Sequence, residues 1–124
     1  MNIIYVGIGG FIGSCSRFLI TRFFLQVLPG FPLGTLVSNI IAGFLIGTII
    51  GVERLLFPLP PNAKLFLTTG LLGGLSTFSA FSLETIVLFE QNNFVLAGLN
   101  IILNVGVSLL CVVLGILLVK NRFL

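Results

Sequence analysis

Residues 70–82 read GLLGGLSTFSAFS, and this stretch decides how the chain can fold. It lies inside an apolar segment from about residue 65 to residue 89, long enough for the roughly 20 residues that a helix needs to cross a bilayer. Three glycines and three hydroxyl residues stand within ten positions, which is poor helix material. Non-helical backbone is tolerated at membrane depth only where protein or a polar cavity satisfies it. We therefore expect a third transmembrane helix that is broken near residues 73–77.

Three more apolar segments surround this stretch, at about residues 3–28, 34–52 and 95–119. The segments between them are rich in proline or polar residues and are expected to be loops or turns: residues 29–32 (PGFP), 57–62 (FPLPPN) and 90–93 (EQNN). The chain is 57% hydrophobic and 7% charged, whereas soluble domains carry about 25% charged residues. Residues 1–124 are therefore expected to form one all-α integral membrane domain of four helices in the cell membrane.

The sequence offers little material for catalysis or for nucleic-acid binding. It has no histidine, and its two cysteines, Cys15 and Cys111, stand far apart inside apolar segments, so common zinc and haem patterns are absent. Glu84 is a lone acid within the third span, where it can be a proton carrier or a structural partner. No basic run resembles a nucleic-acid footprint. We expect neither an enzyme nor a nucleic-acid partner.

The basic residues give a weak orientation signal. Four would lie on one side of the membrane and two nearer the other: Arg54, Lys64, Lys120 and Arg122 against Arg17 and Arg22. The side with more basic residues is usually cytoplasmic, which would place both termini inside. A bias this small fits a single orientation and also fits insertion in both orientations, which would permit an antiparallel dimer.

Polar residues recur at four-residue intervals in the second and fourth spans. Thr35 and Asn39 share one helix face, and so do Asn100, Asn104 and Ser108. A buried amide must find a partner or face a wet pathway. These two stripes predict a hydrated line through the protein, with hydrogen bonding between helices as the alternative.

Phe78 and Phe81 follow the expected break at helical spacing, among the hydroxyl residues Thr77, Ser79 and Ser82. A phenyl ring has a positive edge, which can contact an anion without binding it tightly, as conduction requires. With 13 phenylalanines in the chain, core packing is the alternative. Small residues also recur four apart, as helix contacts in lipid require: Gly9 and Gly13, and Gly43, Gly47 and Gly51.

Three motifs, in order, resemble the Fluc (CrcB) family of fluoride channels. They are GGFIG at residues 9–13 with Arg17, GTL at 34–36 with Asn39 and Gly47, and the 70–82 stretch with Glu84. Some positions differ, since Ser76 and Ala80 replace the usual threonines. The fourth span has Asn100 and Asn104 where an aromatic and a hydroxyl residue are expected.

The resemblance implies two fluoride pathways along the interface of an antiparallel, dual-topology homodimer. It implies pore-lining rings at Phe78 and Phe81, an ion contact at Asn39 and an aqueous vestibule at Arg17. We assign further polar side chains to the same pathway, namely Thr35, Ser79, Asn104 and Ser108. It also implies a structural sodium ion at the dimer axis, bound by the backbone carbonyls of Gly73 and Ser76 from each subunit, and hard cations do prefer oxygen ligands. The departures leave room for a paired homologue in place of the second copy.

The function expected from this resemblance is passive, selective export of fluoride from the cytoplasm, which relieves fluoride toxicity. One alternative is a proton-coupled exporter of the small multidrug-resistance type, which has four short spans. Such exporters place an essential glutamate in the first span, where this chain has Arg17 and no acid. The other alternative is a membrane assembly subunit without transport activity, which would give no reason for the polar stripes.

Overall fold

The computed structural model describes residues 2–124, which form four long apolar helices, and the expectation of an all-helical membrane protein is confirmed. The first span is α1 (Asn2–Val27) and the second is α2 (Leu33–Leu55). The third comprises α3 (Pro61–Lys64), the π-helical η1 (Leu65–Leu72), α4 (Gly73–Leu75) and α5 (Phe78–Glu90). The fourth comprises α6 (Phe94–Ile102), the π-helical η2 (Leu103–Val107) and α7 (Ser108–Phe123).

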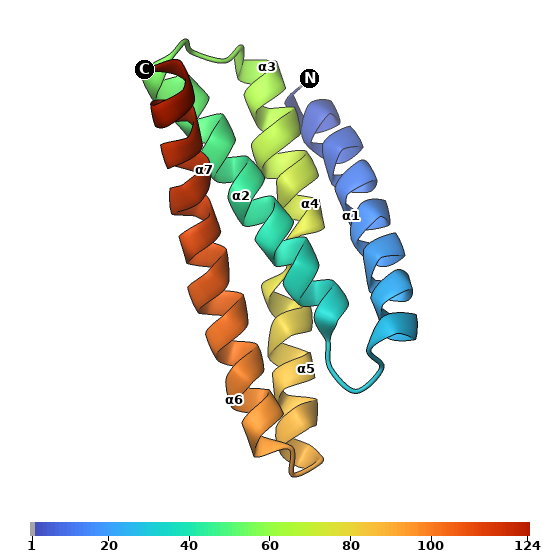
Figure 1. Ribbon diagram of the computed structural model, residues 1–124. Coiled ribbons are helices and arrows are strands. Elements are labelled where there is room, and N and C mark those ends of the chain that lie inside the picture. The colour runs from blue at the N-terminus through green and yellow to red at the C-terminus, as the bar shows by residue number, and fades with distance from the viewer. Residues whose placement is uncertain (1) are drawn as a thin grey trace.

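The four spans run up and down beside one another (Figure 1). Both termini and the α2–α3 loop lie at one end, and the α1–α2 loop and the α5–α6 turn lie at the other. Asn92 in the α5–α6 turn has a φ of 62°, a left-handed conformation that asparagine tolerates better than most residues.

Three helical spans extend beyond the apolar segments expected for them, and the fourth continues past residue 119 to Phe123. The second helix continues through Glu53 and Arg54 to Leu55, and the Glu53 carboxylate pairs with the Lys64 ammonium at 2.9 Å. The third span begins at Pro61, inside the segment expected to be a loop. Proline is well tolerated in the first turn of a helix, because the N–H that it lacks would have no helical partner there.

The third span is interrupted between α4 and α5. Ser76 has φ −81° and ψ 154°, and Thr77 has φ −153° and ψ 128°, so both are extended. The side chain of Thr77 caps α5 by accepting a hydrogen bond from the Ala80 N–H at 3.2 Å. Both extended residues lie in the stretch where glycines and hydroxyl residues gather.

Glycines allow the helices to pack closely within the chain. A Cβ atom on Gly9 or Gly13 of α1 would collide with backbone of η1 and α4. A Cβ on Gly47 of α2 would collide with the Val112 carbonyl of α7, and one on Gly115 with the Phe44 carbonyl of α2. The repeated small residues thus join α1 to the third span and α2 to the fourth.

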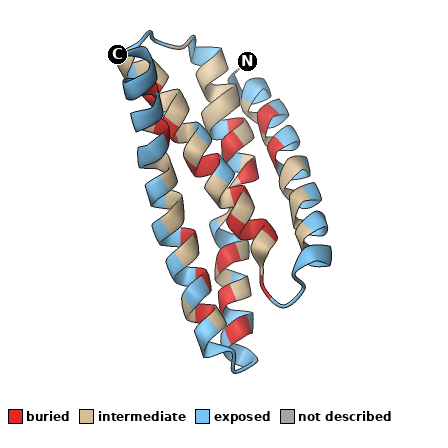
Figure 2. Ribbon diagram, viewed as in Figure 1, coloured by how far each residue is buried: buried red, intermediate tan, exposed pale blue. Residues whose placement is uncertain are grey.

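The buried residues lie where the helices face one another, and the outer surface carries large apolar side chains (Figure 2). Phe11 on α1 is 71% exposed, and Ile102 on the fourth span is 67% exposed. Such a surface is stable against lipid tails, because apolar side chains lose nothing there. The chain is a multi-pass membrane protein.

Candidate functional site

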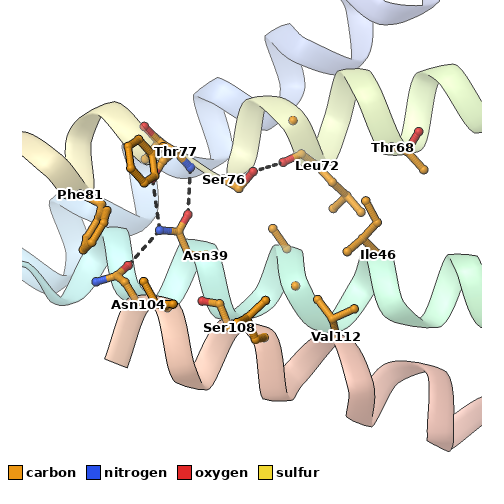
Figure 3. Close-up of a pocket in the computed structure, with 16 residues that line it drawn as sticks. Asn39, Ile46, Thr68, Leu72, Ser76, Thr77, Phe81, Asn104, Ser108 and Val112 are labelled. Atoms are coloured by element: carbon orange, nitrogen blue, oxygen red, sulfur yellow. Dashed lines mark hydrogen bonds between the residues drawn. The ribbon is translucent and has the colours of Figure 1, made fainter. Parts of the chain in front are cut away.

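A groove of about 450 Å³ lies between α2 and the fourth span on one side and the third span on the other (Figure 3). The groove runs along the interrupted part of the third span. Most of the site residues expected from the sequence line it: Asn39, Gly73, Ser76, Phe78, Phe81, Asn104 and Ser108. The structure therefore brings together residues from three spans that are far apart in sequence.

Phe78 and Phe81 form an edge-to-face pair at one part of this groove. Their ring centroids are 5.5 Å apart and the ring planes meet at 64°. Phe81 is buried, with 8% of its surface exposed, whereas Phe78 is 77% exposed. Ser79, beside them, is exposed and does not line the groove, although its hydroxyl lies 3.2 Å from that of Thr77. The pair thus offers one fixed ring and one uncovered ring.

Asn39 holds both main-chain groups of Thr77. Its Oδ1 accepts the Thr77 N–H at 2.8 Å, and its Nδ2 donates to the Thr77 carbonyl at 3.2 Å. The same Nδ2 donates to Oδ1 of Asn104 at 2.9 Å (Figure 3). The two polar stripes therefore meet at Asn39, and this amide links three spans.

The side chains of Asn39 and Thr77 accept hydrogen bonds that the carbonyls of Gly73 and Ser76 would accept in a regular helix. In an unbroken helix the Thr77 N–H would donate to Gly73, and the Ala80 N–H would donate to Ser76. Here these two N–H groups donate to Oδ1 of Asn39 and to Oγ1 of Thr77. The carbonyls of Gly73 and Ser76 thus lose their helical donors and keep oxygen lone pairs that a hard cation could use.

A buried chain of side-chain hydrogen bonds continues from Asn39. Nδ2 of Asn104 donates to Oδ1 of Asn100 at 2.8 Å and to its carbonyl at 2.9 Å. Nδ2 of Asn100 donates to the Thr85 hydroxyl at 2.9 Å, and that hydroxyl donates to the Phe81 carbonyl at 2.7 Å. Sequence reasoning did not assign Thr85 to the site. Its position four residues after Phe81, on the same helix face, was the available signal.

The Ser108 hydroxyl lines the groove and has no hydrogen-bond partner within residues 2–124, although its oxygen is buried. Unpaired buried hydroxyls are costly, so each calls for an explanation by a water, an ion or a partner. The Ser108 hydroxyl therefore keeps a donor proton, beside the groove, that no described residue uses.

Besides Ser79, two expected site residues lie outside the groove. The Thr35 hydroxyl donates to Oε1 of Glu84 at 2.7 Å, and both residues line a second cavity of about 300 Å³ near the α1–α2 loop. Arg17 is half-buried on α1, and its Nε donates to the Gly74 carbonyl at 3.1 Å. That contact places a positive charge beside the last turn of α4, where a helix end attracts cations.

Comparisons with known proteins agree on one family. The family model described as "CrcB-like protein, Camphor Resistance (CrcB)" matches residues 4–116. A Shewanella pealeana protein named fluoride-specific ion channel FluC is 46% identical over 123 residues, which cover 98% of both chains. Proteins of the same name from Clostridium perfringens and Ruminiclostridium cellulolyticum are 48% and 44% identical. Those matches cover 95% and 98% of this chain, and 93% and 94% of the relatives.

Proposed function

The chain belongs to the CrcB family, and from this premise we propose that it is a fluoride-selective passive channel that lets fluoride leave the cytoplasm and so relieves its toxicity. The relatives are named as ion channels and not as enzymes, and the matches cover 98% of this chain and 98% and 94% of the two relatives. It works without a catalytic site.

The observation that carries this proposal is the composition of the groove. Its walls are mainly apolar, and its polar contribution comes from neutral amides and hydroxyls, among them the unpaired hydroxyl of Ser108. The edges of phenyl rings add weak positive potential. A small anion needs donors that replace part of its hydration shell, yet conduction fails if the binding is too strong. The N–H groups of Asn39 and Asn104 donate to protein acceptors, so the Ser108 hydroxyl and the phenyl ring edges are the groups that meet both needs.

We further propose that the conducting unit is an antiparallel homodimer of two oppositely inserted copies. Phe78 is 77% exposed although it adjoins the polar groove, so one wall of the groove is open in the single chain. A second copy related by a two-fold axis would cover the same face on each subunit. The weak difference in basic residues between the two ends supports insertion in both orientations. A paired homologue would cover the groove in the same way.

A structural sodium ion fits the interrupted third span. The donors would be the carbonyls of Gly73 and Ser76, whose helical N–H partners donate to Asn39 and to Thr77 instead. Carbonyl oxygens suit a hard cation, and the ion would hold the two interruptions of the dimer together. Replacing sodium by a larger monovalent cation should lower the dimer fraction in detergent, measured by crosslinking. An unchanged dimer fraction would remove this assignment.

Fluoride efflux from liposomes that contain the purified protein tests the proposed function. A fluoride electrode should record rapid release, while chloride efflux in parallel liposomes stays at the level of protein-free vesicles. Retention of fluoride by a folded, dimeric sample would contradict the homodimeric channel. Co-reconstitution with a paired homologue would then be the next test.

A further inference from the structure

We infer that Thr85 and Asn100 are positioning residues for the fluoride pathway, because they fix the orientation of the amides that hold the interruption of the third span. This inference rests on the proposed function. Neither residue lines the groove, so an effect on permeation passes either through Asn104 and Asn39, as we infer, or locally through Phe81, whose carbonyl accepts from Thr85.

The hydrogen bonds between these side chains all run in one direction. Each amide donates to the next residue, from Asn39 to Asn104, from Asn104 to Asn100 and from Asn100 to Thr85. The Thr85 hydroxyl then donates to the Phe81 carbonyl, which has no proton to give. A hydroxyl that donates in this way can only accept from Asn100, so its direction decides which end of the Asn100 amide points toward it.

Burial leaves these groups no alternative partners. Asn100 is fully buried, and Thr85 and Asn104 are each 5% exposed. In a buried network each hydrogen bond polarises the next, and a donor that loses its acceptor is costly. The Thr85 hydroxyl therefore fixes the orientation of the Asn100 amide, and through it those of Asn104 and Asn39, because no water competes for these hydrogen bonds.

This series of hydrogen bonds ends at the backbone of Thr77, in the interruption of the third span. The orientation of Asn39 lets its Oδ1 accept from the Thr77 N–H while its Nδ2 donates to Asn104 and to the Thr77 carbonyl. If Asn104 no longer offered a fixed acceptor, Asn39 could turn away from Thr77. The Thr77 N–H would then lose its acceptor, and Phe78 would shift with the start of α5.

Thr85→Val removes the hydroxyl and keeps the shape of the side chain. We expect fluoride efflux to fall about tenfold, which corresponds to about 1.4 kcal/mol. Thr85→Ser keeps the hydroxyl and should retain efflux near that of the unmodified chain. Thr48→Val is the matched control, because the Thr48 hydroxyl donates to the carbonyl four residues back, as Thr85 does, but accepts from no side chain among the described residues.

Hydrogen exchange gives a readout that does not depend on transport. In Thr85→Val the amide of Thr77 should exchange faster than in Thr85→Ser or Thr48→Val, because Asn39 is no longer held against it. Unchanged exchange at Thr77 together with reduced efflux would overturn the inference, since Thr85 would then act locally. If the unmodified protein released no fluoride, the proposed function would fail, while exchange at Thr77 would still test the positioning role.

The double variant Thr85→Val with Asn100→Leu separates positioning from folding. The Asn100 amide is then no longer left without its acceptor, so thermal stability should partly recover relative to Thr85→Val alone, although one N–H of Asn104 loses the Asn100 Oδ1. Efflux should stay about tenfold low, because the Asn100→Leu substitution removes the side-chain acceptor that orients Asn104. Recovery of efflux along with stability would show a structural role only and would overturn the inference.

Discussion

Phe81 and Phe78 lie one helical turn apart, yet their environments differ. Phe81 is fixed between helices, and its carbonyl closes the side-chain hydrogen-bond chain, whereas Phe78 projects from the molecule. The ring of Phe81 is thus the one whose position a single subunit determines. The ring of Phe78 needs a neighbour to be fixed.

Phe81→Ile should lower fluoride efflux about tenfold, since an aromatic contact contributes about 0.5–1.5 kcal/mol beyond its area. The substituted side chain is still apolar and should leave the dimer intact, which crosslinking in detergent would show. Phe11→Ile is the matched control, because Phe11 is 71% exposed on the outer face of α1. Equal efflux from both variants would argue against a pore role for Phe81.

Single residues were partly predictable from the sequence. Asn39 stands out as the lone amide of an apolar span, but its partner, the Thr77 backbone, becomes visible only when the two spans are placed together. Thr85 gives only the weak signal of its spacing from Phe81, because hydroxyl residues within helices commonly bond to their own backbone. The roles assigned to Phe78, Asn39 and the sodium-binding carbonyls stay predictions.

At the scale of elements, glycine decides which helices approach each other. Gly47 and Gly115 let α2 and α7 pack with their backbones in contact, whereas nothing lies within 4 Å of the position that a Cβ on Gly98 would take. Gly98 and Gly115, which both lie in the fourth span, therefore differ in whether they tolerate an added methyl group.

Gly47→Ala should destabilise the fold by about 1–3 kcal/mol, because the added methyl group meets the Val112 carbonyl and forces the helices apart. Gly98→Ala should be neutral or stabilising by up to about 1 kcal/mol, since alanine is the better helix former. Thermal unfolding in detergent, followed by circular dichroism, compares the two. Equal loss of stability in both variants would contradict the close-packing argument.

Sequence patterns predicted the four helices well and their details less well. Apolar length identifies a span, because a helix must cross the bilayer. The charges of Glu53 and Arg54 did not end α2, since a charged residue at the membrane surface is compatible with helix. The π-helical segments η1 and η2 had no signal in the sequence, because they depend on how neighbouring helices pack.

At the scale of the whole molecule, the single chain leaves the groove open on one side. The exposed Phe78 and the weak charge difference between the two ends both favour a partner inserted in the opposite direction. The proposed antiparallel dimer therefore forms only if the same chain can insert into the membrane in either orientation.

A cysteine placed at Gln91, in the exposed α5–α6 turn, reports that orientation when Cys15 and Cys111 are replaced by serine. A membrane-impermeant thiol reagent should label about half of the protein in intact cells, because the basic-residue bias is too weak to choose one orientation. The remainder should react after the membrane is permeabilised. Labelling of all or none of the molecules in intact cells would contradict dual insertion.

The π-helical segment η2 sets the rotational phase of the fourth span. Each residue of an α-helix advances the chain by about 100° around the axis, so the number of residues in η2 determines which way α7 faces. Asn104 lies within η2, and Ser108 and Gly115 follow it. Deleting one residue at Val105 would turn Ser108 away from Asn104 and would rotate Gly115 off α2. The π-helical segment η2 thus lets one helix direct Ser108 toward the groove and Gly115 toward α2.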